Sequence, residues 1–208
     1  RFRIGYAPSL SSVVALRERQ KARHAAPRSL LALADPAYPE TRQPSSAAAP
    51  YVERGLALTR LPNTRREVLS IQALFNNARP QVLVGADASE QSLKHEDLSQ
   101  YRYLHLAAHG YLDEEQPSRS GILLFEASGS KEDGILQMGE IARLRLNADL
   151  VTLSACQSGL GEILDGEGVM GLGRAFFHAG AQGLVVSLWN VNDAATAELM
   201  QQFYRHLK

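Results

Sequence analysis

The stretch LVTLSACQSG, residues 150–159, decides the fold that the sequence predicts. Its first six residues form a nearly continuous apolar run, which is typical of a strand that is buried on both faces of a parallel sheet. A second strand-like run, YRYLHLAAHG at 101–110, comes earlier in the chain. The first run leads into Cys156 and the second into His109. Because the carboxyl ends of parallel strands share one edge of a sheet, both side chains are expected at that edge.

Strand-like and helix-like segments alternate through the rest of the chain. Strands are expected at residues 2–6, 29–34, 81–84, 101–108, 121–125, 150–155 and 183–191, and helices at 9–24, 64–78, 89–98, 138–144, 168–179 and from about 194 onward. This alternation predicts an α/β fold, with a mainly parallel central sheet and helices on both faces. Thr64 and Glu67 have the spacing of a capping box at the start of one helix.

The length of 208 residues suits a single domain over residues 1–208, with enough chain to bury a core. The chain begins without Met and stops inside a helical pattern, so we expect it to be a fragment of a longer protein. Residues 36–62 form a proline-rich loop region within the domain, with prolines at 36, 39, 44, 50 and 62.

Charge and composition exclude several classes of function. The 22 basic residues balance the 22 acidic ones, so no strong field would attract nucleic acid or an anionic membrane, and neither is expected as a partner. Cys156 is the one cysteine, which rules out an internal disulfide and a cysteine-based zinc cluster. With no signal peptide and a lone thiol, a cytoplasmic location is expected.

No cofactor or metal is expected from the motifs. The glycines at 166, 168 and 171 spell G-x-G-x-x-G, but they stand too far beyond the preceding strand, among acidic residues, to bind a pyrophosphate. The histidines show no paired metal-ligand spacing. His105 precedes His109 by four residues, which puts both on one strand face, and His105 is expected to be a core residue.

His109 and Cys156 suit nucleophilic chemistry. A thiolate needs a nearby base or cation, and an imidazole can activate the thiol or protonate a leaving amine. Gly110 and Gly159 allow a substrate backbone to approach, and the backbone N–H groups of Gly110 and Cys156 are candidates for an oxyanion hole. The alternative for a lone cysteine is a buried small apolar residue.

Several stretches of the chain resemble the CHAT domain, a caspase- and separase-like peptidase domain that often follows tetratricopeptide repeats. They include LHLAAHG, LVTLSACQSGLG and GEGVMGLGRAFFHAGAQGLVVSLWNVNDAATAELMQQFY. The resemblance implies a caspase-like α/β fold, a catalytic dyad of His109 and Cys156, and control by a repeat domain or partner outside this chain. Ala108 stands where the family commonly has Thr before the histidine.

The resemblance also implies a wall of the substrate pocket in SLWNVND, residues 187–193, which contains Trp189, Asn190 and Asp193. An acid in that wall would favour Arg or Lys before the cut. Asp193 is also a candidate N-cap of the following helix, and one residue can fill both roles.

The resulting hypothesis is a cysteine endopeptidase that cleaves protein or peptide substrates. The side chains of Cys156 and His109 are expected within roughly 4–7 Å of each other, because apo sites are often looser than a tight hydrogen bond. A catalytically silent interaction or scaffold module of the same fold is the alternative, and a redox-sensing thiol at Cys156 is a third.

Overall fold

The computed structural model describes residues 9–21, 23–38, 58–111, 113, 116–154, 167–187 and 193–208. The side chains of residues 167–169 and 193 are not part of this description. The expected strand at 2–6, Cys156 and most of the proline-rich region 36–62 lie outside it.

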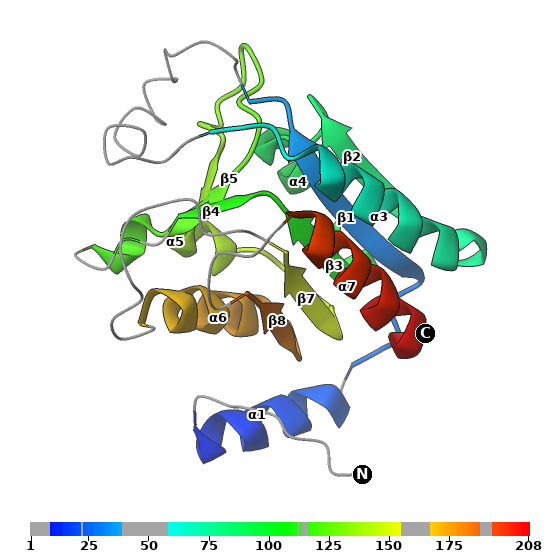
Figure 1. Ribbon diagram of the computed structural model, residues 1–208. Helices are drawn as coiled ribbons and strands as arrows, with labels where there is room; N and C mark the ends of the chain where they lie inside the picture. Colours follow the sequence, from blue (N-terminus) through cyan, green and yellow to red (C-terminus); the bar gives the residue numbers. More distant parts are fainter. Residues whose placement is uncertain are drawn as a thin grey trace.

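A parallel sheet forms the centre of the fold (Figure 1). Its strands are β1 (Arg28–Pro36), β2 (Gln81–Gly85), β3 (Tyr101–Ala107), β7 (Leu150–Leu153) and β8 (Leu184–Val186), in the order β2-β1-β3-β7-β8. Every neighbouring pair in this sheet is parallel. The predicted α/β fold with a mainly parallel sheet is therefore confirmed.

Helices cover both faces of the sheet (Figure 1). α3 (Pro62–Leu74) and α7 (Asp193–Leu207) lie on one face, and α4 (Glu90–His95), α5 (Met138–Ile141) and α6 (Glu167–Ala179) belong to the other. The alternation of side chains along β1 explains this division, because Leu30 and Ala32 pack with α3 and α7 while Leu31 and Leu33 pack into the opposite core.

A small antiparallel sheet follows the carboxyl end of β3. It contains β4 (His109–Tyr111), β5 (Gly121–Leu123) and β6 (Ile135–Gln137), in that order. His109 therefore begins β4 and does not close the strand predicted at 101–108. The strand predicted at 121–125 is shorter and belongs to this second sheet, and β6 was not predicted. Strands of three residues are too short to show a hydrophobic period in the sequence.

Several predicted boundaries shift by a few residues. The helix predicted at 64–78 is α3 followed by the 3-10 turn η1 (Asn76–Ala78), and that at 89–98 is α4 followed by η2 (Leu98–Gln100). A further 3-10 turn, η3 (Pro117–Arg119), precedes β5. The capping box of Thr64 and Glu67 is wrong: the N-cap is Leu61, and the Thr64 hydroxyl donates to the Leu61 carbonyl at 2.6 Å.

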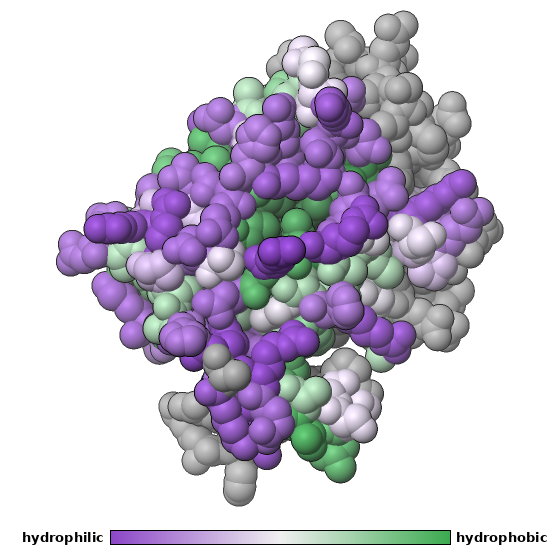
Figure 2. Space-filling view, turned by 180° about the vertical axis from the view of Figure 1, so that it is seen from behind, coloured by the Kyte–Doolittle hydropathy of each residue, from purple (hydrophilic) through white to green (hydrophobic). Residues whose placement is uncertain are grey.

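α1 (Leu10–Lys21) confirms the helix expected at 9–24 and stands apart from the rest (Figure 1). It buries none of its residues, and Arg19 Nη1 joins it to the Phe177 carbonyl of α6 at 2.7 Å. Seen from behind, its protruding surface mixes apolar with charged residues (Figure 2). No helix in the described ranges combines the length and apolar character needed to cross a membrane.

Candidate active site

The carboxyl edge of the sheet brings the ends of β3 and β7 together. The two strands run in parallel with Leu106 opposite Leu153, and the Ser154 N–H donates to the Leu106 carbonyl at 3.0 Å. His109 and Cys156 each follow the last paired residue of their strand by three positions. The pairing places the last described residues of β3 and β7 side by side at this edge.

His109 is held in the buried edge of the second sheet. It is 2% exposed, and its backbone N–H donates to the Tyr38 hydroxyl at 3.1 Å. That hydroxyl in turn donates to the Leu123 carbonyl at 2.7 Å, and the rings of Tyr38 and His109 lie 5.1 Å apart. Burial raises the pKa of Tyr38 far above its ordinary value, so the phenol stays neutral and can make both hydrogen bonds.

The imidazole of His109 faces the chain just before α3. Its Nε2 lies 2.7 Å from the Thr59 carbonyl oxygen. A carbonyl only accepts hydrogen bonds, so Nε2 must carry the proton in the neutral ring. Nδ1 is then the nitrogen that can accept a proton, as a general base requires.

Asp35 occupies the carboxyl end of β1 beside this segment. It is 1% exposed, and Arg60 donates to both of its oxygens, at 2.8 and 2.7 Å. Arg65 of α3 adds a third hydrogen bond at 3.0 Å. Burial alone would raise the pKa of Asp35, but the two guanidinium groups outweigh it and hold the pKa below its ordinary value.

A second buried polar group lies under the sheet, on the α3 and α7 face. His105 Nε2 is 2.8 Å from Glu67 Oε1, and both side chains are fully buried. His105 Nδ1 lies 3.3 Å from the Tyr204 hydroxyl, which is 2.8 Å from the Thr152 hydroxyl. The expectation that His105 is a core residue is confirmed, and its contact with Glu67 explains why no capping box forms.

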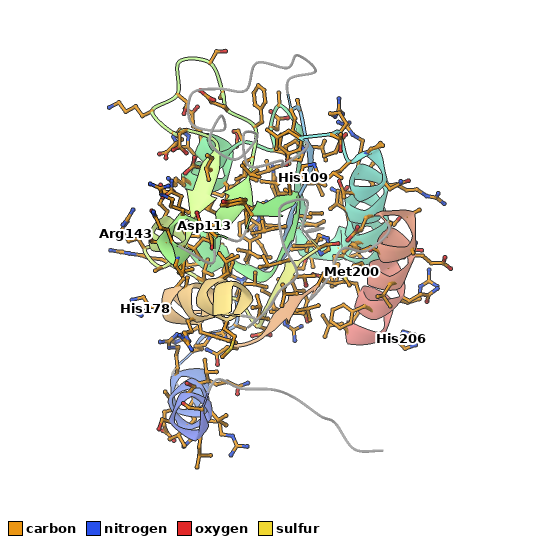
Figure 3. The ribbon with its side chains drawn as sticks, turned by 60° about the vertical axis from the view of Figure 1, so that its left-hand side comes forward. His109, Asp113, Arg143, His178, Met200 and His206 are labelled. Carbon is orange, nitrogen blue, oxygen red and sulfur yellow. The ribbon has the colours of Figure 1, made fainter. Side chains whose placement is uncertain are left out.

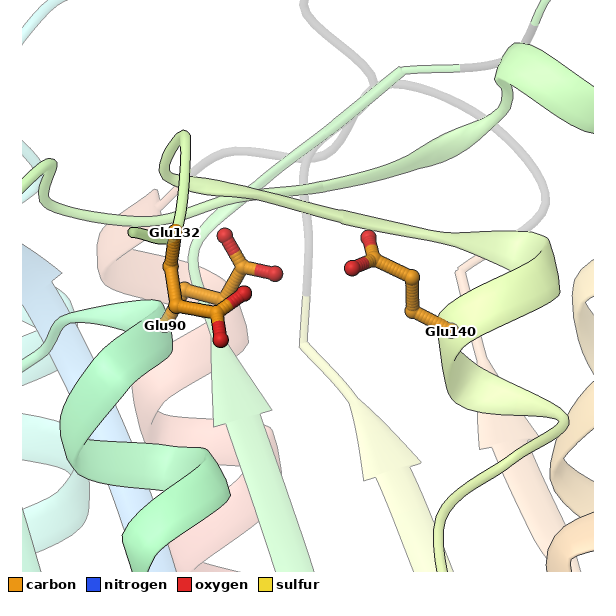
Figure 4. A group of neighbouring side chains, drawn as sticks. All are labelled: Glu90, Glu132 and Glu140. Carbon is orange, nitrogen blue, oxygen red and sulfur yellow. The ribbon is translucent and has the colours of Figure 1, made fainter. Parts of the chain in front are cut away.

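Three carboxylates outside this edge could resemble a metal site. Ligand oxygens of Glu90, Glu132 and Glu140 lie within 4.8 Å of one another (Figure 4). The Lys94 ammonium fills their centre: it lies 2.6 Å from Glu90 and 2.7 Å from Glu140, and it also contacts Glu132. The three carboxylates therefore form a cluster of ion pairs around one lysine, Lys94.

Glu90 has an unusual environment within that cluster. Its Oε2 accepts the Gly134 N–H at 2.9 Å, and its side chain is 1% exposed. Burial is the main cause that raises the pKa of Glu90 to about 7, and the nearby Glu140 adds to it, against the lowering effect of Lys94.

The structure describes only some of the other predicted site residues. Gly110 is buried in the middle of β4, and the backbone of Asp193 begins α7. Cys156, Trp189 and Asn190 fall outside the described ranges, so the expected distance of 4–7 Å from Cys156 to His109 stays a prediction.

The residues that hold His109 belong to no motif recognised in the sequence. Tyr38 and Thr59 belong to the proline-rich loop region 36–62, and Asp35 directly follows the strand predicted at 29–34. One signal was present: an acidic residue directly after an apolar strand, in LLALADP, stands at the edge where sites form.

Two hollows lie elsewhere, against α3 and α7. One of about 710 Å³ is lined by Leu69 and Ala73 together with Arg66 and Arg205, and a neighbouring one of about 390 Å³ includes Ser70. His109 lines neither of them. Figure 3 shows His109 at the end of the sheet, away from His178 on α6 and His206 near the end of α7.

Comparison with known proteins agrees with this geometry. The CHAT domain family model matches residues 1–208, so the chain belongs to the CHAT domain family, which is caspase-like. The chain is similar to the mouse protein "Tetratricopeptide repeat protein 28", with 38% identity over 73 residues. That alignment covers 35% of this chain and 3% of the mouse protein, so the chain corresponds to a small part of that relative.

Proposed function

We propose that this protein is a cysteine endopeptidase that uses Cys156 as nucleophile and His109 as its base. The observation that carries the proposal is the pairing of β3 with β7, from which His109 and Cys156 follow at the same offset. Cys156 comes two residues after Ser154, and two residues of chain span at most about 7 Å, which supports a nucleophile near this edge. The hydrogen bond from His109 to Thr59 supports a base that is oriented for proton transfer.

The chemistry follows from these roles. The Cys156 thiol gives its proton to His109 Nδ1, and its sulfur attacks the carbonyl carbon of the scissile peptide. When the C–N bond breaks, His109 returns that proton to the leaving amine. Water then cleaves the thioester, which restores the thiol and releases the acid. The Thr59 carbonyl stabilises the imidazolium through Nε2–H during both steps.

The remaining candidate residues bind the substrate. The backbone N–H groups of Gly110 and Cys156 stabilise the oxyanion, and Trp189 and Asn190 form a wall of the pocket. Asp193 at the start of α7 selects a basic side chain before the cut. Asp193→Asn should then lower turnover of an arginine peptide and leave turnover of a leucine peptide unchanged.

Regulation is assigned to a repeat domain or a partner protein outside this chain, in the cytoplasm. The similarity to a tetratricopeptide repeat protein supports such an arrangement. Purified chain that gains activity when a repeat-domain partner is added would bear this out.

Turnover of a peptide library by the wild type and by matched variants tests the dyad. Cys156→Ala and His109→Ala should each lower kcat/KM at least about 1,000-fold, because both residues act in one unit. His178→Ala is the control, since His178 is exposed on α6 and should leave turnover unchanged. Equal activity of wild type and Cys156→Ala would reject the peptidase.

The hollow beside α3 and α7 favours a second candidate function, an interaction module. Leu69 is 48% exposed there, next to Arg66. If binding to partners is the whole function, Leu69→Asp should abolish complex formation, whereas Cys156→Ala should change no cellular phenotype.

A further inference from the structure

We infer that Asp35 is a positioning residue, which holds the Thr59 carbonyl against His109 by clamping Arg60 and Arg65. The inference rests on the proposed function for its catalytic meaning. The contacts themselves join three elements: the end of β1, the segment before α3, and α3.

The clamp acts on the residue next to Thr59. Arg60 binds Asp35 with two parallel hydrogen bonds, a fork geometry that fixes direction as well as distance. The Thr59 carbonyl belongs to the peptide bond that joins Thr59 to Arg60. Holding Arg60 in place therefore also restricts the orientation of this carbonyl. The acceptor of His109 Nε2–H therefore lies one peptide unit from a residue that is tied to a buried carboxylate, and not in a regular element.

The start of α3 is tied to the same carboxylate. Arg65 donates to Asp35 Oδ2, and the backbone N–H of Asp35 donates to the Thr64 hydroxyl at 2.9 Å. Thr64 in turn donates to the Leu61 carbonyl. Arg60, Thr64 and Arg65 thus bind Asp35 from both sides of the helix start, and Thr64 links Leu61 to the same group.

The backbone of Asp35 fits this role. Its φ of 46° is in the left-handed region, which Asp and Asn tolerate better than other non-glycine residues. Asp35→Asn therefore keeps the backbone conformation and the size of the side chain while it removes the charge that holds both arginines. This substitution therefore weakens the clamp without changing the local fold.

The test measures the tautomer of His109 in the 208-residue chain by ¹⁵N NMR, at a pH where the ring is neutral. In the wild type we expect the Nε2–H form to predominate. Asp35→Asn should lower the ratio of Nε2–H to Nδ1–H forms about tenfold, the effect of losing one hydrogen bond. Asp149→Asn is the matched control, because Asp149 also binds two arginines, Arg23 and Arg102, before β7 begins.

An unchanged ratio in Asp35→Asn, an equal change in Asp149→Asn, or a wild type in the Nδ1–H form would each overturn the inference. If Asp35→Asn does not fold, Arg60→Lys serves in its place. Lys keeps the charge without the two-pronged geometry, so a lowered ratio supports the clamp and an unchanged ratio rejects it. The readout needs no turnover, so a chain without peptidase activity whose tautomer responds rejects the proposed function alone.

Discussion

Two ionic clusters in the described part of the chain have opposite balances of charge. At the carboxyl edge one buried carboxylate, Asp35, meets two arginines, whereas beside α4 one lysine, Lys94, meets three glutamates. Burial raises carboxyl pKa values in both. The pKa of Asp35 nevertheless lies below its ordinary value, and that of Glu90 rises to about 7. At Asp35 two guanidinium groups outweigh the effect of burial, whereas at the equally buried Glu90 one shared ammonium does not.

The difference matters for what each cluster can do. Asp35 stays ionised across the physiological range and can hold a fixed geometry next to His109. Glu90 changes its protonation near neutral pH, so the contacts of Lys94 with Glu132 and Glu140 depend on pH. A carboxylate that supports a catalytic base is better placed in the first environment than in the second.

Removal of Asp35 should cause the largest loss. Asp35→Ala is expected to lower the free energy of unfolding by about 3 kcal/mol, because it removes the hydrogen bonds from two partly exposed guanidinium groups and puts Ala in the left-handed region. Urea unfolding at pH 7 measures it. Asp35→Asn, which tolerates that backbone, should lose less. A loss below about 1 kcal/mol for Asp35→Ala would reduce the clamp to a weak surface pair.

Glu90 should give stability that depends on pH. Its folded pKa of about 7 lies above the ordinary 4.5, so the folded state binds the proton more tightly. The stabilisation is complete below pH 4.5 and is lost as the pH rises through 7. We expect about 2 kcal/mol to be lost over this interval in the wild type relative to Glu90→Gln. Unfolding curves measured from pH 4.5 to 8 that run parallel would contradict this.

Glu140 shares Lys94 with Glu90 but should behave in the opposite sense. Burial raises the pKa of Glu140, but the hydrogen bonds from Lys94 and from the Gln137 N–H outweigh it, and the pKa lies below its ordinary value. Its stabilisation is present at neutral pH and is lost as the pH falls through the folded pKa. Glu140→Gln should cost about 1 kcal/mol at pH 7 and nothing at low pH. A cost that grows on acidification would contradict a lowered pKa at Glu140.

The central sheet could be predicted from the sequence because four of its five strands are mainly apolar runs of four or more residues, and the three residues of β8 lie within the longer apolar run predicted at 183–191. The register of β3 with β7 follows from two such runs, and so does the edge that carries His109. The hydrogen bond from His109 to Thr59 joins residues 50 positions apart, and the one from Arg60 to Asp35 joins residues 25 apart. No local pattern encodes contacts of that range.

The wrong capping box shows how tertiary contacts override a local motif. Thr64 and Glu67 have the right types and spacing, and an isolated peptide could use them. In the fold, the buried imidazole of His105 needs a polar partner, and Glu67 on the inner face of α3 supplies it. The neighbouring strand therefore decides the role of Glu67.

The smallest effect is expected at Asp149, and it shows whether burial or charge balance makes the Asp35 clamp strong. Asp149 also meets two arginines, at 2.7 Å from Arg102 and 3.2 Å from Arg23, but its side chain is 42% exposed. Water and salt screen such a cluster, so Asp149→Asn should cost only about 0.5 kcal/mol of unfolding free energy. Urea unfolding at low and high salt measures it, and the cost should shrink further at about 1 M salt. A loss as large as that of Asp35→Asn would mean that two arginines suffice without burial. A small loss here beside a large one at Asp35 assigns the strength of the clamp to the burial of its carboxylate.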